Sequence, residues 1–224
     1  MKLLQYLYYF IRSISFRGPY KTSRMLYYET YYDRVLNIHT KRIRNLGNLT
    51  LAGTNSMENH HYQGASYMIL FQLMNRLPAL VRNKPFIDYG CGKARPLFVA
   101  EQCGFTKLIG VDIAKELLED AKKNLESYTR KNAESQFDFV FEDATKYQIP
   151  EDAAIFYLFN PFGESILAKV AANIKESYRQ HPREIYVLYV NPKYHTVFEQ
   201  QGFVKHEVMR SFLYKEAILY TLKS

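Results

Sequence analysis

Two acidic side chains and a glycine turn in the middle of the chain have types and spacing suited to nucleoside binding. Residues 86–89 have the short apolar pattern of a buried strand that contains Asp88, and the turn Gly90-Cys91-Gly92 follows. Glycines in such a turn let backbone amides approach a ligand closely. A second predicted strand, residues 107–112, ends at Asp112, where a carboxylate can accept hydrogen bonds from a ribose diol. The spacing therefore predicts a nucleoside site.

Two kinds of nucleoside ligand compete for this pattern. A dinucleotide site has a third glycine that lets helix and strand pack closely around a pyrophosphate, and here Arg95 stands at that position. Asp88 would repel a pyrophosphate, whereas a carboxylate suits S-adenosylmethionine (SAM), which carries an ammonium and a sulfonium but no phosphate. The residues favour SAM. A nicotinamide-dependent oxidoreductase and a non-catalytic nucleoside-binding protein stay as alternatives.

The loop and the second acid resemble the first two motifs of the class I (Rossmann-like) SAM-dependent methyltransferases. The first motif of that family has the form acid-x-Gly-x-Gly-x-Gly, and Ala94 replaces its last glycine here. The loop Gly-Cys-Gly-Lys-Ala-Arg with a later Asn-Pro-Phe looks closest to small, mostly uncharacterised bacterial members, and the loop is also similar to that of lysine methyltransferases with a Rossmann fold. The resemblance implies SAM as cofactor, bound by Asp88, Gly90, Cys91, Gly92, Asp112 and Ile113.

A third acid follows the next predicted strand, residues 137–142. In the resembled family, an acid or amide at this place accepts a hydrogen bond from the adenine amine, and the following backbone amide reaches a ring nitrogen. The resemblance thus assigns Asp143 and Ala144 to adenine. Two alternatives stay open, because Asp also caps helices readily and because a strand register shifted by one would place Glu142 there.

The predicted catalytic residues are Asn160, Pro161 and Phe162, at the carboxyl end of a fourth strand, residues 155–159, and Asn160 is also assigned to cofactor binding. Open α/β sheets place their reacting groups at such ends. An amide oxygen and a proline carbonyl can accept hydrogen bonds from a planar amine, and an aromatic ring can stack on it. The motif resembles the Asn/Asp-Pro-Pro-aromatic signature of methyltransferases that act on base amines or glutamine amides, but has a single proline. A simple turn after a buried strand is the alternative.

Other residues near these motifs have weaker assignments. A helix is predicted over residues 62–77, and its start, with Tyr62, is expected near the methionine end of SAM, although core packing also explains Tyr62. Lys93 and Arg95 are expected either to steer an anionic substrate or to face solvent and pair with Glu101. Cys91 is interpreted as a small residue that fills the turn.

The positive charge is concentrated in the first part of the chain. The net charge is +8, and residues 1–84 hold twelve Lys or Arg against three acids, together with ten of the twenty tyrosines. Bases interleaved with flat aromatics suit nucleic acid through phosphate contacts and base stacking. They equally suit an anionic membrane surface. The acceptor of the methyl group is not identified by any motif.

Composition also limits the location of the protein. Residues 1–16 have apolar side chains at helical spacing, which indicates an amphipathic helix that packs on the domain, lies on a membrane or grips the substrate. Neither of the two cysteines lies in a disulfide or metal framework, so a reducing cytoplasm is expected, with a peripheral membrane location as the alternative. No apolar run approaches the ~20 residues of a membrane span. His60-His61 is interpreted as a loop, and no metal site is predicted.

The order of predicted elements gives the fold class. Strands alternate with helices from residue 86 to residue 190, and residues 203–212 and 213–222 form a closing antiparallel pair. The expected fold is α/β: a seven-stranded, mostly parallel, doubly wound sheet with a C-terminal antiparallel hairpin, preceded by a helical N-terminal extension. The extension is assigned to residues 1–57 and the SAM-dependent methyltransferase domain to residues 58–224.

Overall fold

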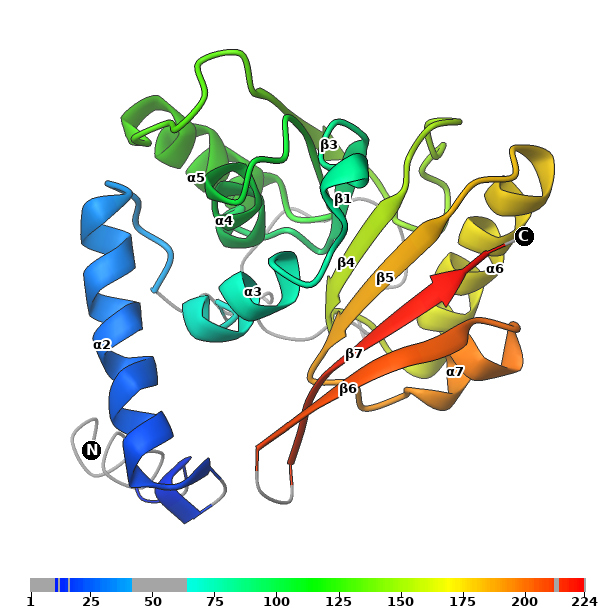
Figure 1. The fold of residues 1–224 in the computed structure, drawn as a ribbon. Helices are drawn as coiled ribbons and strands as arrows, with labels where there is room; N and C mark the ends of the chain where they lie inside the picture. Colours follow the sequence, from blue (N-terminus) through cyan, green and yellow to red (C-terminus); the bar gives the residue numbers. More distant parts are fainter. Residues whose placement is uncertain (1–10, 12, 16, 42–63, 212–213, 224) are drawn as a thin grey trace.

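A computed structural model describes residues 11–41, 64–211 and 214–223, except residues 12 and 16 (Figure 1). It contains one seven-stranded sheet in the order β3-β2-β1-β4-β5-β7-β6, in which β1 to β5 are parallel and β7 is antiparallel to β5 and β6. The strands are β1 Pro85–Tyr89, β2 Lys107–Asp112, β3 Gln136–Phe141, β4 Ile155–Phe159, β5 Ile185–Val190, β6 Val204–Ser211 and β7 Tyr214–Leu222. The predicted fold class is confirmed.

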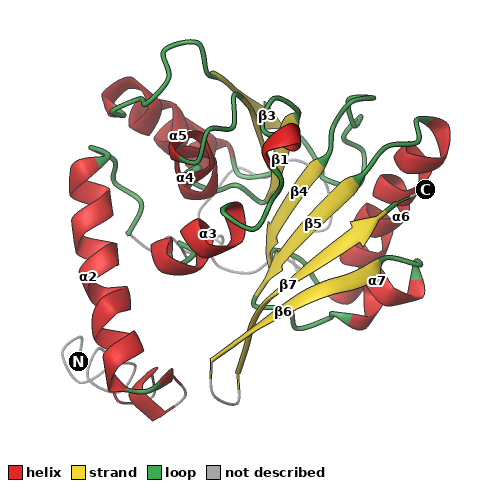
Figure 2. Ribbon diagram, in the orientation of Figure 1, coloured by secondary structure: helices red, strands yellow, loops and turns green. Residues whose placement is uncertain are grey.

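Helices lie on both faces of the sheet (Figure 2). The α-helices described over their full length are α2 Pro19–Val35, α3 Tyr67–Met74, α4 Arg95–Gln102, α5 Lys115–Ser127, α6 Glu164–Gln180 and α7 Thr196–Gln200, with a 3-10 turn at Ala79–Val81. Because side chains alternate along a strand, Ile155 and Tyr157 of β4 join the core beneath α3 and α4, whereas Phe156 and Leu158 join the core beneath α6. Strands buried on both faces explain the continuous apolar runs of β4 and β5.

Most predicted elements lie within a few residues of their observed bounds. The largest difference is the helix expected over residues 62–77: α3 begins only at Tyr67, after an extended Ser66, and ends at Met74. Residues 42–63, and with them Tyr62 and His60-His61, lie outside the described residues, as does most of the segment 1–16.

The described part of the N-terminal extension contains α2, which runs beside α3 along one flank of the molecule (Figure 1). Gly18, at φ 80°, precedes the helix, and Pro19 begins it, where its missing N–H costs nothing. The ring of Tyr32 packs against Tyr67, with centroids 5.4 Å apart, and against Phe71, at 4.6 Å. This part of the extension is therefore packed onto the domain that follows it.

Candidate active site

A cavity of about 360 Å³ opens at the carboxyl ends of β1, β2 and β4. β1 lies between β2 and β4, so the cavity sits where the strand order reverses, the place at which open α/β sheets bind ligands. Among its lining residues are most of those predicted from the sequence: Asp88, Gly90, Cys91, Asp112, Ile113, Ala144, Asn160, Pro161 and Phe162. Gly92 and Asp143 do not line it.

The glycine loop is tied to β2 by its own backbone. The amides of Gly90 and Cys91 both donate to the carbonyl of Val111, at 2.8 and 3.2 Å. Gly90 has φ 73°, and a Cβ there would lie 2.6 Å from the Cβ of Pro161. Glycine at this position therefore lets the loop touch the Asn160-Pro161 turn, which brings the predicted cofactor and catalytic motifs together.

Ala94, which replaces the last glycine of the resembled motif, keeps the backbone conformation that favours glycine. Its φ is 65° and its ψ 21°, in the left-handed region, at the N-cap of α4. A non-glycine residue rarely adopts this conformation. Ala94 is fully buried in the core, so the packing of its methyl group offsets part of that strain.

Asp88 places a carboxylate oxygen without a hydrogen-bond partner in the cavity wall. The residue is 1% exposed, and its Oδ2 atom accepts no hydrogen bond from any described residue. Burial, with a smaller contribution from Asp112, raises the pKa of Asp88 well above its usual value. Tyr157, its neighbour on β4, also lines the cavity with a hydroxyl that has no hydrogen-bond partner in the described chain. Such orphaned groups indicate a site for a polar ligand.

The carboxylate of Asp112 holds the glycine loop. Its Oδ2 accepts from the amide of Gly92 at 2.7 Å, and its Oδ1 accepts from the amide of Ala114 at 2.8 Å. Burial raises the pKa of Asp112 to about 6, although these amide hydrogen bonds oppose the shift. Carboxylate oxygens have about four acceptor sites, so this side chain can also accept from a diol.

At the third acid, Glu142 rather than Asp143 lines the cavity. Oδ1 of Asp143 accepts from the amide and the hydroxyl of Thr145, at 2.9 and 2.8 Å. Asp143 thus closes a local turn, which is neither the helix cap nor the adenine contact expected from the sequence. Glu142 and Ala144 are the lining residues in this loop.

The Asn160-Pro161-Phe162 turn continues directly from β4. Asn160 is 8% exposed and has φ 40°, an uncommon conformation for a residue other than glycine. Its amide oxygen accepts from the hydroxyl of Tyr189, 2.9 Å away on β5. Backbone and side chain are thus both held, which presents the turn to the cavity in one orientation.

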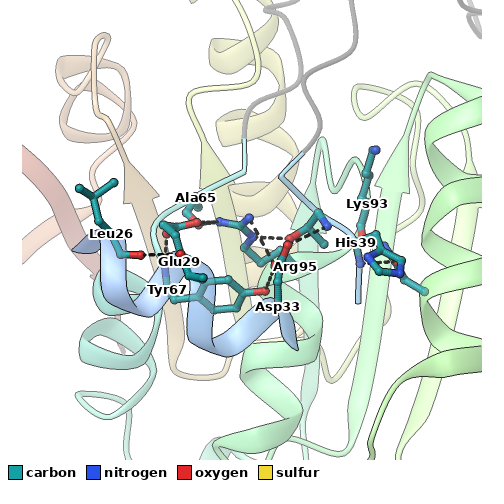
Figure 3. Close-up of polar contacts among 11 residues, drawn as sticks. Leu26, Glu29, Asp33, His39, Ala65, Tyr67, Lys93 and Arg95 are labelled. Atoms are coloured by element: carbon teal, nitrogen blue, oxygen red, sulfur yellow. Dashed lines mark hydrogen bonds and ion pairs between the residues drawn. The ribbon is translucent and has the colours of Figure 1, made fainter. Parts of the chain in front are cut away.

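Arg95 differs from the sequence-based expectation. It is 2% exposed and lies at the centre of a polar cluster (Figure 3). Its Nη1 donates to Oε2 of Glu29 at 2.6 Å and to the carbonyl of Ala65 at 2.7 Å, and its Nε donates to Thr40 Oγ1 at 2.7 Å. The guanidinium also lies 4.4 Å from the ring centroid of Tyr67. Arg95 therefore connects the glycine loop to α2.

One of the two alternatives for Lys93 and Arg95, that they face solvent and pair with Glu101, is wrong. Lys93 is buried and pairs with Asp120 at 3.2 Å. Glu101 accepts instead from the hydroxyl of Tyr128 at 2.6 Å and from the amide of Asn132, also at 2.6 Å. Two charged residues that follow the glycine loop thus belong to the packed interior.

Sequence reasoning missed several lining residues. Asn191 stands at the end of β5 with φ 51°, as Asn160 stands at the end of β4, and each asparagine precedes a proline. The repeat of Asn-Pro after a predicted strand could have identified Asn191 as a second lining residue from the sequence. The other lining residues not assigned to the cavity are Gly64, Ala65, Arg95, Pro96, Val111, Leu117, Tyr157 and Phe159.

The described residues contain neither a membrane-spanning helix nor a group of metal ligands. No helix in the described ranges is long and apolar enough to cross a membrane. Within the same ranges, no three His, Cys, Asp or Glu side chains are grouped in a way that could hold a metal ion.

Comparisons with known proteins point to the same class of enzyme as the cavity does. A family model described as "Methyltransferase domain" matches residues 80–202. No protein in the curated set matches the chain. A putative RNA methyltransferase from Pyrococcus horikoshii is similar in structure, with a TM-score of 0.53 and 15% identity over 80% of this chain and 92% of that one.

Two further solved structures share the fold. Magnesium protoporphyrin IX methyltransferase from Synechocystis, with bound SAM, has a TM-score of 0.51 and 15% identity over 70% of this chain and 79% of that one. A putative SAM-dependent methyltransferase from Methanococcus maripaludis has a TM-score of 0.52 and 15% identity over 70% and 84%. The oxidoreductase and non-catalytic alternatives are set aside: the chain belongs to the methyltransferase domain family and is a SAM-dependent methyltransferase.

Proposed function

We propose that the enzyme transfers the methyl group of SAM to a nitrogen atom of an acceptor that meets the Asn160-Pro161-Phe162 turn. One observation carries the proposal: a single cavity has the orphaned carboxylate of Asp88 in its wall and this turn at the end of the adjacent strand. The first feature fits a cationic ligand, and the second fits an amine.

The lining residues fit SAM. The Oδ2 atom of Asp88, which accepts no hydrogen bond within the described chain, would pair with the ammonium of the methionine moiety. Asp112 would accept from the ribose diol, as its position at the end of β2 suggests. Glu142 and the backbone of Ala144 would reach the adenine, with Asp143 shaping their loop through Thr145.

The chain itself supplies orientation. When bound, SAM would supply an electrophilic methyl, so that the acceptor nitrogen forms an N–C bond as the S–C bond breaks, S-adenosylhomocysteine (SAH) leaves, and the methylated nitrogen releases its proton to solvent. The side-chain oxygen of Asn160 and the carbonyl of Pro161 accept N–H groups of the acceptor, which directs its lone pair. Phe162, 5% exposed, excludes water beside them. Orientation and exclusion of water can provide most of the acceleration, so no general base is required.

Substitution of Asn160 tests this proposal. In Asn160→Ala, we expect methyl transfer from tritiated SAM into fractionated cell extract to fall by about 100-fold, the order seen when one oriented polar contact at a reacting centre is lost. The Kd for SAM, measured by calorimetry, should stay the same. Asn132→Ala, in a loop away from the cavity, is the control. Unchanged turnover in Asn160→Ala would remove this turn from the mechanism.

We propose further that single-stranded nucleic acid binds the outer face of α2. Tyr20, Tyr27 and Tyr31 are 73%, 60% and 43% exposed, and Arg24 and Arg34 are exposed between and after them. Their spacing of three or four residues places them along one stripe of the helix. The rings of Tyr27 and Tyr31 stack at 5.4 Å, which offers a flat surface to bases, while the two arginines suit phosphates.

The effect of Tyr27→Ala on RNA binding, together with a vesicle assay, separates nucleic acid from the membrane alternative. Affinity for a single-stranded RNA oligomer should fall steeply as salt rises, and Tyr27→Ala should weaken it by about 1–3 kcal/mol. Co-sedimentation with phosphatidylserine vesicles, together with RNA binding that Tyr27→Ala leaves unchanged, would instead assign this stripe to a membrane surface.

A further inference from the structure

A second cavity, of about 520 Å³, adjoins the first and lies between α2 and the ends of β4, β5 and β7. The two cavities have four lining residues in common: Gly64, Arg95, Phe159 and Asn191. Neither the family match nor the related structures assign a ligand to it. Because it meets the SAM cavity beside the Asn160 turn, a molecule in it would lie next to the reacting end of SAM.

One part of this second cavity is positively charged. The buried carboxylate of Glu216 accepts from Arg17 Nε at 2.9 Å and from Lys21 Nζ at 2.8 Å, and its side chain is 0% exposed. Lys41, which is exposed, lines the same cavity. Arg17 and Lys21 thus meet the one carboxylate of Glu216, and Lys41 adds a further positive charge to the cavity wall, so these four side chains carry a net positive charge.

The guanidinium of Arg17 can make further contacts. Its Nε donates to Glu216. Its Cζ atom lies over the ring of Tyr214, 5.1 Å from the ring centroid. Within the described ranges, its two Nη atoms donate no hydrogen bond to protein. A guanidinium presents paired N–H groups that match the oxygens of a carboxylate or a phosphate.

The rest of the second cavity is suited to an uncharged, largely apolar body. Met25 and Leu26 of α2, Ile69 of α3, and Val190 and Phe159 at the strand ends contribute apolar surface to its wall. Arg95 does not add a second positive centre, because Glu29 and Asp33 pair with it at 2.6 and 3.6 Å. The volume is within the range of small-molecule sites.

We propose that the second cavity is the acceptor site, and that the acceptor carries an anionic group, a carboxylate or a phosphate, bound by Arg17 and Lys41. This rests on the proposed methyl transfer, since the cavity adjoins the Asn160 turn. The anionic group belongs either to a free small molecule or to the backbone of a nucleic acid. The N-terminal extension thereby supplies the wall that selects the acceptor.

Binding of inorganic phosphate tests the anion site without any transfer reaction. With SAH-saturated protein, calorimetry should detect phosphate binding that weakens about tenfold or more in Arg17→Gln and in Lys41→Glu, the loss expected for one charged hydrogen bond. Lys41→Glu alters an exposed residue, and circular dichroism checks that both variants fold. The control is Arg179→Gln on α6, where the arginine side chain is 71% exposed. Phosphate affinity equal in all four proteins would overturn the proposal.

Transfer from tritiated SAM then identifies the source of the anion. Wild-type protein should label acceptors that an anion exchanger retains, and Arg17→Gln should raise the KM for that fraction about tenfold or more with the Kd for SAM unchanged. Label in a low-molecular-weight filtrate indicates a free small molecule, and label that nuclease releases from a polymer indicates a nucleic acid. Label only in acceptors that pass through the exchanger would overturn the anion site.

The two proposals fail in distinguishable ways. If phosphate binds as described but Asn160→Ala transfers methyl groups at the wild-type rate, the proposed role of the turn fails and the anion site stands. If Asn160→Ala loses transfer while neither Arg17→Gln nor Lys41→Glu changes KM or phosphate affinity, the anion site fails and the proposed function stands.

Discussion

Asp112 illustrates how one carboxylate can serve both the fold and a proposed ligand. It holds the glycine loop through Gly92 and begins the next turn through Ala114, yet it also lines the cavity. Its raised pKa means that the folded apoprotein binds the proton more tightly than the unfolded chain does. The stability contributed by this protonation is present below the usual carboxyl pKa and is lost as pH rises through about 6.

The affinity for SAM should therefore change with pH around this value. Because the ionised carboxylate accepts from a diol better than the acid does, we expect the Kd for SAM to be about tenfold weaker at pH 5 than at pH 7. Asp112→Asn should bind more weakly at pH 7 and lack the inflection near pH 6. Calorimetry across this range measures both, with the exposed Asp152→Asn as control. An inflection near pH 6 that persists in Asp112→Asn would assign it to another group.

At the scale of elements, the glycine loop after β1 and the turn after β4 form one unit. Their contact is between Gly90 and Pro161, and the space there admits no side chain on the glycine. Gly104 offers a comparison, since its φ of 93° is also left-handed but the nearest atom to an added Cβ is Nη1 of the Arg82 side chain, at 3.3 Å. The two glycines share a left-handed backbone, in which any side chain would be strained, and differ in the atoms that an added Cβ would meet.

Gly90→Ala should therefore reduce methyl transfer far more than Gly104→Ala. Both substitutions cost about 1–2 kcal/mol of folding free energy from the left-handed backbone. Only Gly90→Ala also pushes Pro161 away, so we expect a loss of transfer of about 100-fold, as for other displacements of about 1 Å at a reacting centre. Denaturant unfolding measures the loss of folding free energy, and transfer of tritiated methyl measures the loss of activity. Equal losses of transfer in the two variants would show that the contact does not position the turn.

The elements themselves were largely predictable, because their signals are local. Apolar runs bounded by Gly, Asn or Pro predicted β1, β2, β4 and β5, and the same punctuation placed the cavity at their carboxyl ends. The partners of Arg95 were not predictable, since Glu29 and Asp33 lie more than sixty residues away along the chain. A charged residue that follows the glycine loop was expected either to steer an anionic substrate or to face solvent, and only tertiary packing shows Arg95 buried.

At the scale of the whole molecule, the N-terminal extension is the part that the sequence described least well. Its charge suggested an arm that reaches toward a partner, yet Arg17 and Lys21 pair with Glu216 of β7, at the other end of the chain. A charge count cannot distinguish a base that faces solvent from one that closes a buried ion pair. The same helix has an inner face that lines the second cavity and an outer face with exposed tyrosines.

Asp88 is expected to lower the stability of the apoprotein while it increases the affinity for SAM. A buried acid without a partner costs folding free energy because it loses its hydration, and the same burial holds the pKa of Asp88 well above the usual value. Asp88→Asn should thus raise the thermal midpoint of the apoprotein. Adding SAM should raise the midpoint of this variant only slightly. For the wild type, SAM at about 100 times its Kd contributes about 2.7 kcal/mol, which corresponds to roughly 5–10 °C for a domain of this size. NAD at the same concentration should leave the midpoint unchanged. A wild-type shift with NAD but not with SAM, or an Asp88→Asn variant that is less stable yet equally protected by SAM, would contradict the role of Asp88 as the cation-binding group.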